Sequence, residues 1–197
     1  MMITRTITIL AIMMFAVLSN SCFSPYVFSS GEESEIYDQK SLARLSRVVV
    51  LPLSVSPYSE ISKVQTGPLS DSLWKEIDAQ KVLSLAPMDS VRLVEEQFSN
   101  NDTLSRKELS KVFSPDAFIK TELIYVIPPG YGKTYTATLM MVILDANNWK
   151  PLAYFSFDTF KGKTYIGAPR LEKVTSDAIK GVSQTLAKNL NKLRGRH

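Results

Sequence analysis

Hydrophobic positions follow two kinds of spacing along this chain, and together they predict one α/β domain. Continuous or alternating apolar runs predict strands over residues 47–53, 82–85, 117–127, 135–145 and 152–160. Apolar residues spaced three or four apart predict helices that begin near residues 66, 89 and 105, and a last helix over residues 169–193. The expected order is β-α-β-α-α-β-β-β-α, a mixed sheet with helices in a single domain over residues 47–197.

The strands differ in how completely their side chains are apolar. The run from Val48 to Leu53 is continuous and β-branched, which is typical of a strand that is buried on both faces. In residues 117–127 apolar positions alternate with polar ones such as Lys120 and Glu122, which predicts a strand with one wet face. The polar turn at residues 146–151 predicts that the last two strands form an antiparallel hairpin.

Polar residues before three of the helices predict where each helix begins. Thr66 and Asp89 are each expected to cap the first turn of a helix. Ser105 and Glu108 have the spacing of a capping box. A hydrophobic staple is expected beside this box, from Leu104 and Leu109.

The amino-terminal segment has the organisation of a secretion signal. Arg5 precedes an apolar run from Ile7 to Val17, and small residues follow before Cys22. A helix that spans a bilayer needs about 20 apolar residues, and this run is about half that length. We therefore expect residues 1–21 to be a cleaved signal peptide and not a membrane-spanning helix.

Cys22 is the only cysteine, and it stands where the apolar run gives way to a serine-rich stretch. Its position resembles a lipobox, where a bacterial lipoprotein is cleaved before a cysteine and acylated on the sulfur. Leu18 lies four residues before Cys22 instead of three, and Asn20 stands where alanine or serine is usual. The alternative is an ordinary secretory leader cleaved near Ser21, which leaves an unpaired exported thiol. We expect covalent lipid, such as palmitate, on Cys22, and two or three acyl chains make the membrane association effectively stable.

Residues 22–46 are expected to be an acylated, flexible tether. From Phe23 to Ser46 the composition shifts to serine, glycine and glutamate without a helical or strand period. About 20 such residues have a root-mean-square span of roughly 25 Å and a maximal reach of about 70 Å. Such a tether lets the folded body stand off the membrane.

The residue inventory argues against most enzymatic mechanisms. The single histidine, His197, is the final residue, which leaves no set for a Ser/His/Asp triad or for a zinc site of histidine and cysteine. Neighbouring acids such as Glu95 and Glu96 do not face each other on a helix. We expect no catalytic residue, no metal and no cofactor apart from the lipid. An enzyme that uses carboxylates alone is the alternative.

The charge balance changes this interpretation little. The formal charge is +4 for the full chain, and the loss of Arg5 with the leader lowers it to +3. The excess lies mostly in the last helix and its tail, at Lys188, Lys192, Arg194 and Arg196. Such a run can contact nucleic acid or anionic lipid, or it can be the solvated end of a helix. For an exported protein we expect a solvated helix end and no nucleic-acid partner.

One glycine-rich loop bears a partial likeness to a phosphate-binding motif. Residues 130–134 read Gly-Tyr-Gly-Lys-Thr, but Ile127 occupies the place of the first glycine. The loop also leads into a strand, whereas phosphate capture needs the start of a helix. We expect a hairpin loop with no small-molecule substrate.

Large aromatic residues in predicted turns are the candidate partner contacts. Tyr131 and Trp149 fall in the two turns that join the last three strands. Packing does not need an aromatic side chain there, and an exposed one can contact a partner. Together with Lys133, they form the predicted partner-binding set.

Four segments of the chain resemble a group of bacterial envelope lipoprotein domains. These segments are Arg47 to Leu53, Gly67 to Trp74, Val91 to Gln97 and Asp116 to Lys120. The group includes the curli-secretion lipoprotein CsgG, the penicillin-binding-protein activator LpoB and the N-terminal domain of TolB, and the likeness covers roughly residues 47–193. The resemblance implies a non-enzymatic domain that docks onto, assembles or regulates other envelope proteins.

The resemblance also suggests a location and a second hypothesis. Among such lipoproteins the residue after the acylated cysteine influences sorting, and Phe23, which is not aspartate, implies the outer membrane, with the domain facing the periplasm. The chain lacks the long amphipathic hairpins with which CsgG builds a pore. An accessory lipoprotein that binds an envelope partner is therefore the first interpretation. The alternative is a subunit of an oligomeric export assembly that resembles the curli channel.

Overall fold

The computed structural model describes residues 31–61, 63–98, 102–127, 135–162 and 170–195. In these residues seven strands form one mixed sheet in the order β1-β7-β6-β5-β2-β4, with β3 paired to β5. The strands are β1 Glu32–Ile36, β2 Arg47–Val50, β3 Ser54–Val55, β4 Ser84–Leu85, β5 Ala117–Val126, β6 Thr136–Asp145 and β7 Pro151–Asp158. The helices are α2 Gln39–Arg44, α3 Thr66–Ala79, α4 Met88–Gln97, α5 Asp102–Phe113, α6 Thr159–Gly162 and α7 Leu171–Leu193. The predicted α/β class is confirmed.

The sheet is most deeply buried where the sequence is most apolar. β2 pairs in parallel with β5 on one side and with β4 on the other. Val48, Val49 and Val50 are fully buried, with Val48 and Val50 in one hydrophobic cluster and Val49 in another. β2 is therefore buried on both faces, as its β-branched run predicts.

Strands β5, β6 and β7 form an antiparallel meander. Ala117 at the start of β5 pairs with Asp145 at the end of β6, and Leu139 of β6 pairs with Phe157 of β7. The predicted hairpin of the last two strands is confirmed. Lys120 of β5 is exposed while its neighbours on the strand are buried, which agrees with one wet face.

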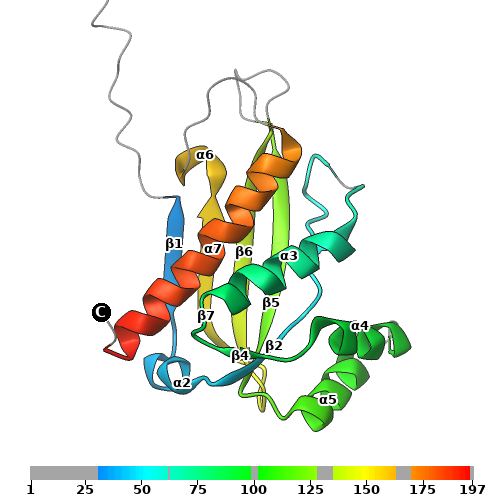
Figure 1. The fold of residues 1–197 in the computed structure, drawn as a ribbon, viewed down its shortest axis with the longest axis vertical. Coiled ribbons are helices and arrows are strands. Elements are labelled where there is room, and N and C mark those ends of the chain that lie inside the picture. The colour runs from blue at the N-terminus through cyan, green and yellow to red at the C-terminus, as the bar shows by residue number, and fades with distance from the viewer. Residues whose placement is uncertain (1–30, 62, 99–101, 128–134, 163–169, 196–197) are drawn as a thin grey trace, which may run out of the picture.

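Helices α3 and α7 cross one face of the sheet beside each other (Figure 1). Leu73 and Ile77 of α3 and Val182 of α7 are fully buried in the main hydrophobic cluster. Gly181 allows α7 to approach β7 closely, because a Cβ atom at this position would lie 2.3 Å from Cγ of Phe157. The absence of a side chain at Gly181 therefore sets the distance between helix and sheet.

The structure places the caps of α3 and α4 before the predicted residues, by one residue for α3 and by two for α4. Thr66 is the first residue of α3 rather than its cap, and the capping residue Gln65 makes no side-chain hydrogen bond. α4 begins at Met88, after Pro87, so Asp89 lies in the first turn instead of capping it. Both helices therefore begin without the side-chain cap that the sequence suggested.

The predicted capping box of α5 is wrong. The helix begins at Asp102, so Ser105 lies inside it and its hydroxyl donates to Glu95 of α4 instead of capping the backbone. Leu104 also lies inside the helix, which removes the geometry of a staple with Leu109. The pairing of two helices, which local sequence does not show, overrides the capping signal.

Residues 31–46 belong to the domain and do not form part of a tether, which corrects the sequence interpretation. β1 pairs antiparallel with β7 along its whole length. α2 follows, with Asp38 as its cap: the carboxylate accepts a hydrogen bond of 2.9 Å from the Ser41 N–H, and Leu42 is fully buried. The polar composition was misleading because β1 is an edge strand, whose backbone pairs on one side while its central side chains stay in water. Only residues 22–30, outside the described residues, can still form the predicted tether.

The basic end of α7 is also not simply solvated. The guanidinium of Arg194 donates to the carbonyl oxygens of Ala43 at 3.1 Å and Val82 at 2.7 Å. Lys188 forms an ion pair of 2.8 Å with Glu32 of β1. These contacts tie the end of α7 to α2, to β1 and to the loop before β4.

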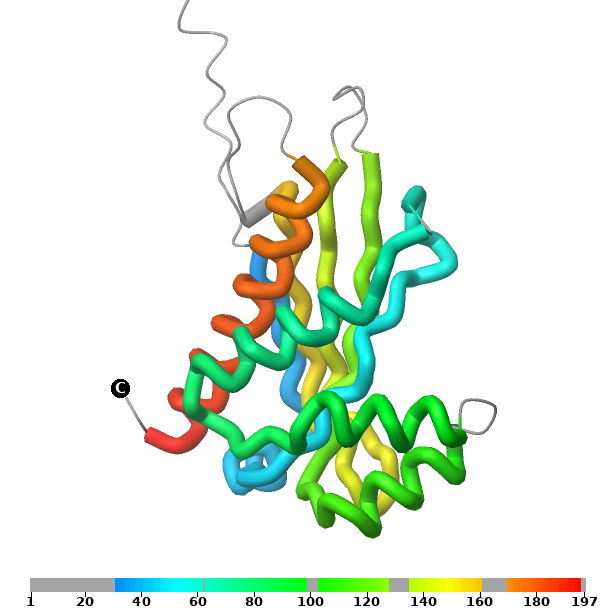
Figure 2. Tube along the Cα trace, turned by 45° about the vertical axis from the view of Figure 1, so that its right-hand side comes forward, coloured from blue at the N-terminus to red at the C-terminus, as the bar shows by residue number. Residues whose placement is uncertain are grey.

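The opposite face of the sheet is covered differently. α4 and α5 form a helical hairpin at one end of the sheet, away from α7 (Figure 2). They pack against Val49 and Phe118, which point to this face. Further along the same face, side chains from β5, β6 and β7 are only half-buried: Ile124, Met140, Val142 and Tyr154.

Candidate partner-binding surface

Three of the four predicted site residues, Cys22, Tyr131 and Lys133, lie outside the described residues, and their roles stay predictions. Trp149 is described. It lies in the turn between β6 and β7, where it is half-buried and packs against the cluster under α4 and α5.

Trp149 has a packing role that the sequence did not reveal. Its ring stacks on Phe118 of β5, with centroids 4.5 Å apart and ring planes inclined by 25°. The guanidinium carbon of Arg106 in α5 lies 4.6 Å from the centroid of the Trp149 ring, a cation–π geometry. The premise that this turn does not need an aromatic side chain for packing was therefore wrong. A contact between Trp149 and a partner stays a prediction.

The turn that carries Trp149 is held by a network of hydrogen bonds. The Asp145 carboxylate accepts from the N–H groups of Asn147 at 2.8 Å and Asn148 at 3.1 Å. Trp149 has a φ of 62°, in the left-handed region, which costs on the order of 1 kcal/mol for a residue with a side chain. The stacking on Phe118 and the bonds to Asp145 offset this cost and fix the direction of the ring.

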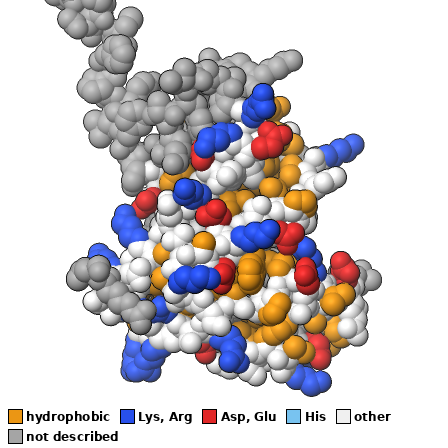
Figure 3. All heavy atoms as spheres, viewed as in Figure 1, with side chains coloured by type: hydrophobic (Ala, Val, Ile, Leu, Met, Phe, Trp, Pro, Cys, Tyr) orange, Lys and Arg blue, Asp and Glu red, His pale blue; other side chains and the backbone are white. Residues whose placement is uncertain are grey.

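The helical hairpin of α4 and α5, called the hairpin below, has one buried and one exposed side. Val91 and Leu109 face inwards and are fully buried. With Val49 and Phe118 of the sheet they belong to one hydrophobic cluster, called the second cluster below. On the outside three large hydrophobic side chains are exposed: Leu93 at 68%, Leu104 at 47% and Val112 at 54%. Figure 3 shows hydrophobic atoms gathered over the hairpin and its boundary with α3, whereas charged side chains of both signs are interspersed over α7.

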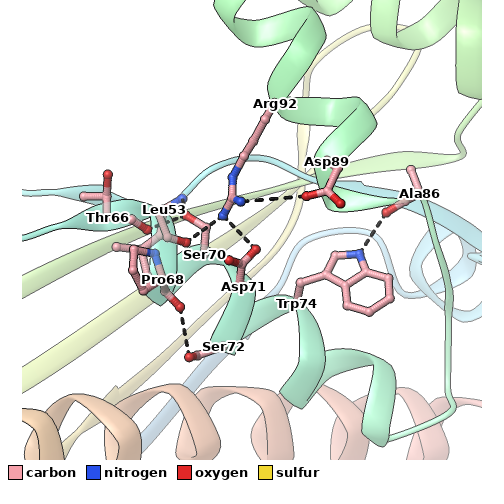
Figure 4. A network of polar contacts seen from close by, with 11 residues as sticks. Leu53, Thr66, Pro68, Ser70, Asp71, Ser72, Trp74, Ala86, Asp89 and Arg92 are labelled. Carbon is pink, nitrogen blue, oxygen red and sulfur yellow. Dashed lines mark hydrogen bonds and ion pairs between the residues drawn. The ribbon is translucent and has the colours of Figure 1, made fainter.

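A polar network joins the hairpin to α3 (Figure 4). Nη2 of Arg92 in α4 donates to the carbonyl oxygen of Gly67 at 2.6 Å and lies 2.7 Å from Oδ1 of Asp71. Its Nη1 lies 4.0 Å from Oδ1 of Asp89. Because the Arg92 side chain is about a quarter exposed, its contacts to Gly67 and Asp71 are better shielded from water than an ordinary surface ion pair, whereas Asp89 is almost fully exposed.

Two side chains of α3 extend the network to neighbouring segments. The Ser70 hydroxyl accepts a hydrogen bond from the N–H of Leu53 at 2.9 Å and donates to the Thr66 carbonyl at 2.8 Å. The indole N–H of Trp74 donates to the Ala86 carbonyl at 2.8 Å, just before α4 (Figure 4). The hairpin is therefore held at its base by side chains of both α3 and α4.

A hollow of about 440 Å³ lies beside this network. Its wall includes Trp74, Leu85 and Met88, and Asp71 and Asp89 also line it. Apolar walls with a few polar groups suit the insertion of an anchoring side chain from a partner. Both acids engage Arg92, which is the arrangement of a structural ion pair.

A second groove, of about 640 Å³, lies between α3 and the first turns of α7. Val64, Leu69 and Ile179 line it, together with Tyr125, whose hydroxyl lies 2.6 Å from Oγ1 of Thr175. Burial raises the pKa of the Tyr125 phenol above its ordinary value. The phenol therefore stays protonated near neutral pH and serves as a hydrogen-bonding group.

In the part of the chain that the structure describes, no group of three or more His, Cys, Asp or Glu side chains is placed to hold a metal ion. Within the same residues no helix is both long enough and apolar enough to cross a bilayer.

Comparison with solved structures gives similar folds at low sequence identity. The PelC dodecamer from Paraburkholderia phytofirmans is 12% identical with a TM-score of 0.50, over 79% of this chain and 97% of that chain. Lipoprotein GNA1162 from Neisseria meningitidis is 18% identical with a TM-score of 0.40, over 70% of this chain and 96% of that one. A putative neuraminyllactose-binding hemagglutinin homolog from Helicobacter pylori is 10% identical with a TM-score of 0.46, over 78% and 90%.

Comparisons with known protein families and with curated proteins give no match. The likeness to PelC shows a shared fold, because at this identity the arrangement of elements is what the two chains have in common. None of these three structures is CsgG, LpoB or TolB, so that relation stays a prediction.

Proposed function

We propose that this protein is a membrane-anchored, non-enzymatic lipoprotein of the bacterial envelope whose α/β domain binds, assembles or regulates another envelope protein. The hairpin carries the proposal. Leu93, Leu104 and Val112 expose large apolar side chains on two helices that the second cluster and the Arg92 network hold in place. Exposed apolar side chains on a rigid support are typical of protein contact surfaces.

The membrane attachment in this proposal is a lipid on Cys22. Metabolic labelling with a fatty acid, compared between the wild type and Cys22→Ala, tests it directly. We expect label on the wild type and none on the variant. A wild-type chain that carries no acyl group would leave an exported protein without this anchor.

The location and partner class follow the resemblance to the CsgG, LpoB and TolB group. We propose the outer membrane, with the domain facing the periplasm, because Phe23 follows the acylated cysteine. Tyr131, Lys133 and Trp149 are proposed as additional contacts, of which Trp149 lies beside the hairpin, next to Arg106. Fractionation of the two membranes tests the location.

In-cell photo-crosslinking tests the hairpin as the partner surface. A photoreactive residue in place of Leu93 is expected to give a discrete covalent adduct with an envelope protein. The matched control is the same residue in place of Lys180, which is exposed on α7. Equal adduct yields at the two positions, or none at Leu93, contradict the proposal.

A second candidate function is that of a subunit in an oligomeric export assembly. The observation that favours it is the half-buried apolar face of β5, β6 and β7, with Ile124, Met140, Val142 and Tyr154. One solved structure with a similar fold, PelC from Paraburkholderia phytofirmans, is a dodecamer, and this also supports an oligomeric state as a candidate for this chain. Light scattering in detergent separates the two candidates, because a ring predicts a closed oligomer that Val142→Lys disrupts. A monomer argues for the accessory role.

A further inference from the structure

Among the described residues, the exposed large hydrophobic side chains lie at the two ends of the domain. Within the described residues, those that are exposed are Tyr37, Tyr58, Leu93, Leu104, Val112, Val126 and Phe160. None of them lies on α3 or α7, the two helices that cross the sheet. The hairpin carries three of these residues, and Tyr37 follows β1 at the same end of the sheet, because its N–H donates to the carbonyl of Leu152 at the start of β7. Tyr58, Val126 and Phe160 remain and require a separate explanation.

These three residues lie together at the opposite end, called the tether end below. It comprises the start of β1, the end of β5, the start of β6 and the end of β7 with α6. The sheet pairing brings these strand ends together (Figure 1). β7 pairs antiparallel with β1 on one side and with β6 on the other, and β6 pairs antiparallel with β5. Val126 is the last residue of β5, and Phe160 is in α6, directly after Thr159, whose hydroxyl accepts a hydrogen bond of 2.9 Å from the N–H of Ala137 in β6.

The segment that carries Tyr58 is fixed at the same end by hydrogen bonds to β5. The N–H of Glu60 donates to the carbonyl of Tyr125 at 3.0 Å, and the Glu60 carboxylate accepts from the N–H of Ile127 at 2.8 Å. Tyr58 is 87% exposed, Phe160 45% and Val126 40%. Three separate segments therefore each present one large hydrophobic side chain at the tether end.

The predicted lipid anchor attaches to this same end. The carbonyl of Gly31 accepts a hydrogen bond of 2.8 Å from the N–H of Asp158, so the domain begins beside the end of β7. Nine residues lead from Cys22 to Gly31, and covalent geometry limits their reach to about 30 Å. The 23 residues of α7, which runs from the tether end to the other end of the sheet, alone extend about 35 Å. The anchor therefore holds the tether end closer to the lipid surface than any other part of the domain.

The charges at this end do not indicate a purely electrostatic contact. Among the described residues, the exposed charged residues there carry both signs: Lys63, Arg170 and Lys173 are basic, and Glu33, Glu60 and Glu172 are acidic. Tyrosine and phenylalanine are suited to the boundary between headgroups and acyl chains, where an apolar ring can leave water while polar groups stay hydrated. Apolar contact is therefore the attraction that this surface offers to a bilayer.

We propose that the tether end rests on a lipid bilayer, with the side chains of Tyr58, Val126 and Phe160 in its interfacial region. The hairpin end then points away from the membrane and is open to a protein partner. This proposal rests on the proposed lipidation of Cys22, because the short tether brings the tether end to the surface. It differs from the interpretation in which a tether over residues 22–46 lets the domain stand off the membrane, because residues 31–46 belong to the domain.

The test is quenching of tryptophan fluorescence by brominated lipids, with the purified lipidated protein in phosphatidylcholine vesicles. Tyr58→Trp and Phe160→Trp place the probe at the tether end. Tyr37→Trp, 56% exposed at the hairpin end, is the matched control. The native Trp74 and Trp149 give a wild-type baseline that is subtracted, and circular dichroism verifies that each variant is folded.

We expect brominated lipids to quench the tryptophan fluorescence of Tyr58→Trp and Phe160→Trp. The quenching should be strongest when the bromine atoms lie on the acyl chain close to the headgroups, because an interfacial side chain enters the bilayer by only about 5–10 Å. The Tyr37→Trp signal should not change. Equal quenching at Tyr37→Trp and Tyr58→Trp, or no quenching at the tether end, overturns the proposal. Replacing part of the phosphatidylcholine by phosphatidylglycerol should have little effect, and quenching that requires the anionic lipid overturns the apolar contact.

Flotation with the vesicles and mass spectrometry of Cys22 separate this inference from the function on which it rests. A protein that carries lipid and floats, yet shows no quenching at the tether end, refutes the orientation and leaves the anchor intact. A chain without lipid on Cys22 that does not float refutes the anchor and, with it, the orientation.

Discussion

The two ends of the domain expose hydrophobic side chains in different ways. At the tether end, Tyr58, Val126 and Phe160 come singly from three separate segments. At the hairpin end, Leu93 and Val112 lie on helices that have a hydrophobic cluster of their own. The side chains at the tether end are exposed because their segments end there, whereas the hairpin packs as a separate unit around its own cluster. The hairpin end can therefore be weakened without loss of the tether end.

The largest effect is expected from the second cluster. Phe118 is fully buried in β5 and contacts both the cluster and the Trp149 ring. Phe118→Ala should lower the free energy of unfolding by about 3–5 kcal/mol, because it leaves a cavity under the hairpin. Denaturant titration measures the loss. Hydrogen exchange should show that amides of α4 and α5 lose more protection than those of α7, and a uniform loss would contradict the separation of the two ends.

A smaller effect is expected from the network at the base of the hairpin. Arg92→Met removes the bonds to Gly67 and Asp71 but keeps much of the apolar stem, and it should cost about 1–3 kcal/mol of unfolding free energy. The control is Lys111→Met, which breaks the 3.6 Å pair with Glu108 and should cost at most about 1 kcal/mol, since the lysine is well exposed. Equal losses in thermal or chemical unfolding would show that the network adds nothing beyond a surface ion pair.

The region near the tether end should respond to alkaline pH. Tyr125→Phe removes the hydrogen bond to Thr175 and should cost about 1 kcal/mol at neutral pH. Burial raises the folded-state pKa of Tyr125 above the ordinary 10.0, so its contribution is complete below that value and is lost as pH rises through the folded-state pKa. The variant should lose less stability above pH 10 than the wild type. A variant whose stability falls as steeply at alkaline pH as that of the wild type would contradict this role of the Tyr125 hydroxyl.

The smallest effect is expected at the cap of α2, which lies at the hairpin end, because the N–H of Asp38 donates to the carbonyl of Leu152 at the start of β7. Hydrogen bonds from the N–H and the hydroxyl of Ser41 lower the pKa of Asp38. The carboxylate therefore contributes stability above its unfolded-state pKa, and this contribution is lost as pH falls through the lower folded-state pKa. Asp38→Asn should flatten the acid side of the stability curve slightly. An acid limb as steep as that of the wild type would mean that the cap is not formed in solution.

The main fold was predictable because its signals are carried within single elements. The apolar run of β2, the alternation in β5 and the helical period of α7 each require burial on a defined face. These patterns predicted the sheet, the antiparallel pair of β6 and β7 and the long helix α7 close to where the structure has them. The order of elements was correct except for β1, α2, β3 and α6.

The omissions have one physical cause, which is stabilisation by distant partners. β1 is polar because an edge strand needs only backbone pairing with β7, so no apolar period marks it. Ser105 reads as a cap but bonds to Glu95 on a neighbouring helix. Trp149 reads as a free aromatic in a turn but stacks on Phe118, 31 positions earlier in the chain. Spacing along the chain carries no information about such pairs.

The sequence by itself determined that this chain forms an α/β domain after an apolar amino-terminal run and a single cysteine, because hydrophobic periodicity and residue inventory are local properties. Only the tertiary structure decided which exposed side chains lie at the same end. It joined Tyr58, Val126 and Phe160 next to the start of the domain and placed the hairpin at the other end, through sheet pairing and the Arg92 network. Those contacts connect residues far apart in the chain, where only packing and hydrogen bonding in three dimensions can select them.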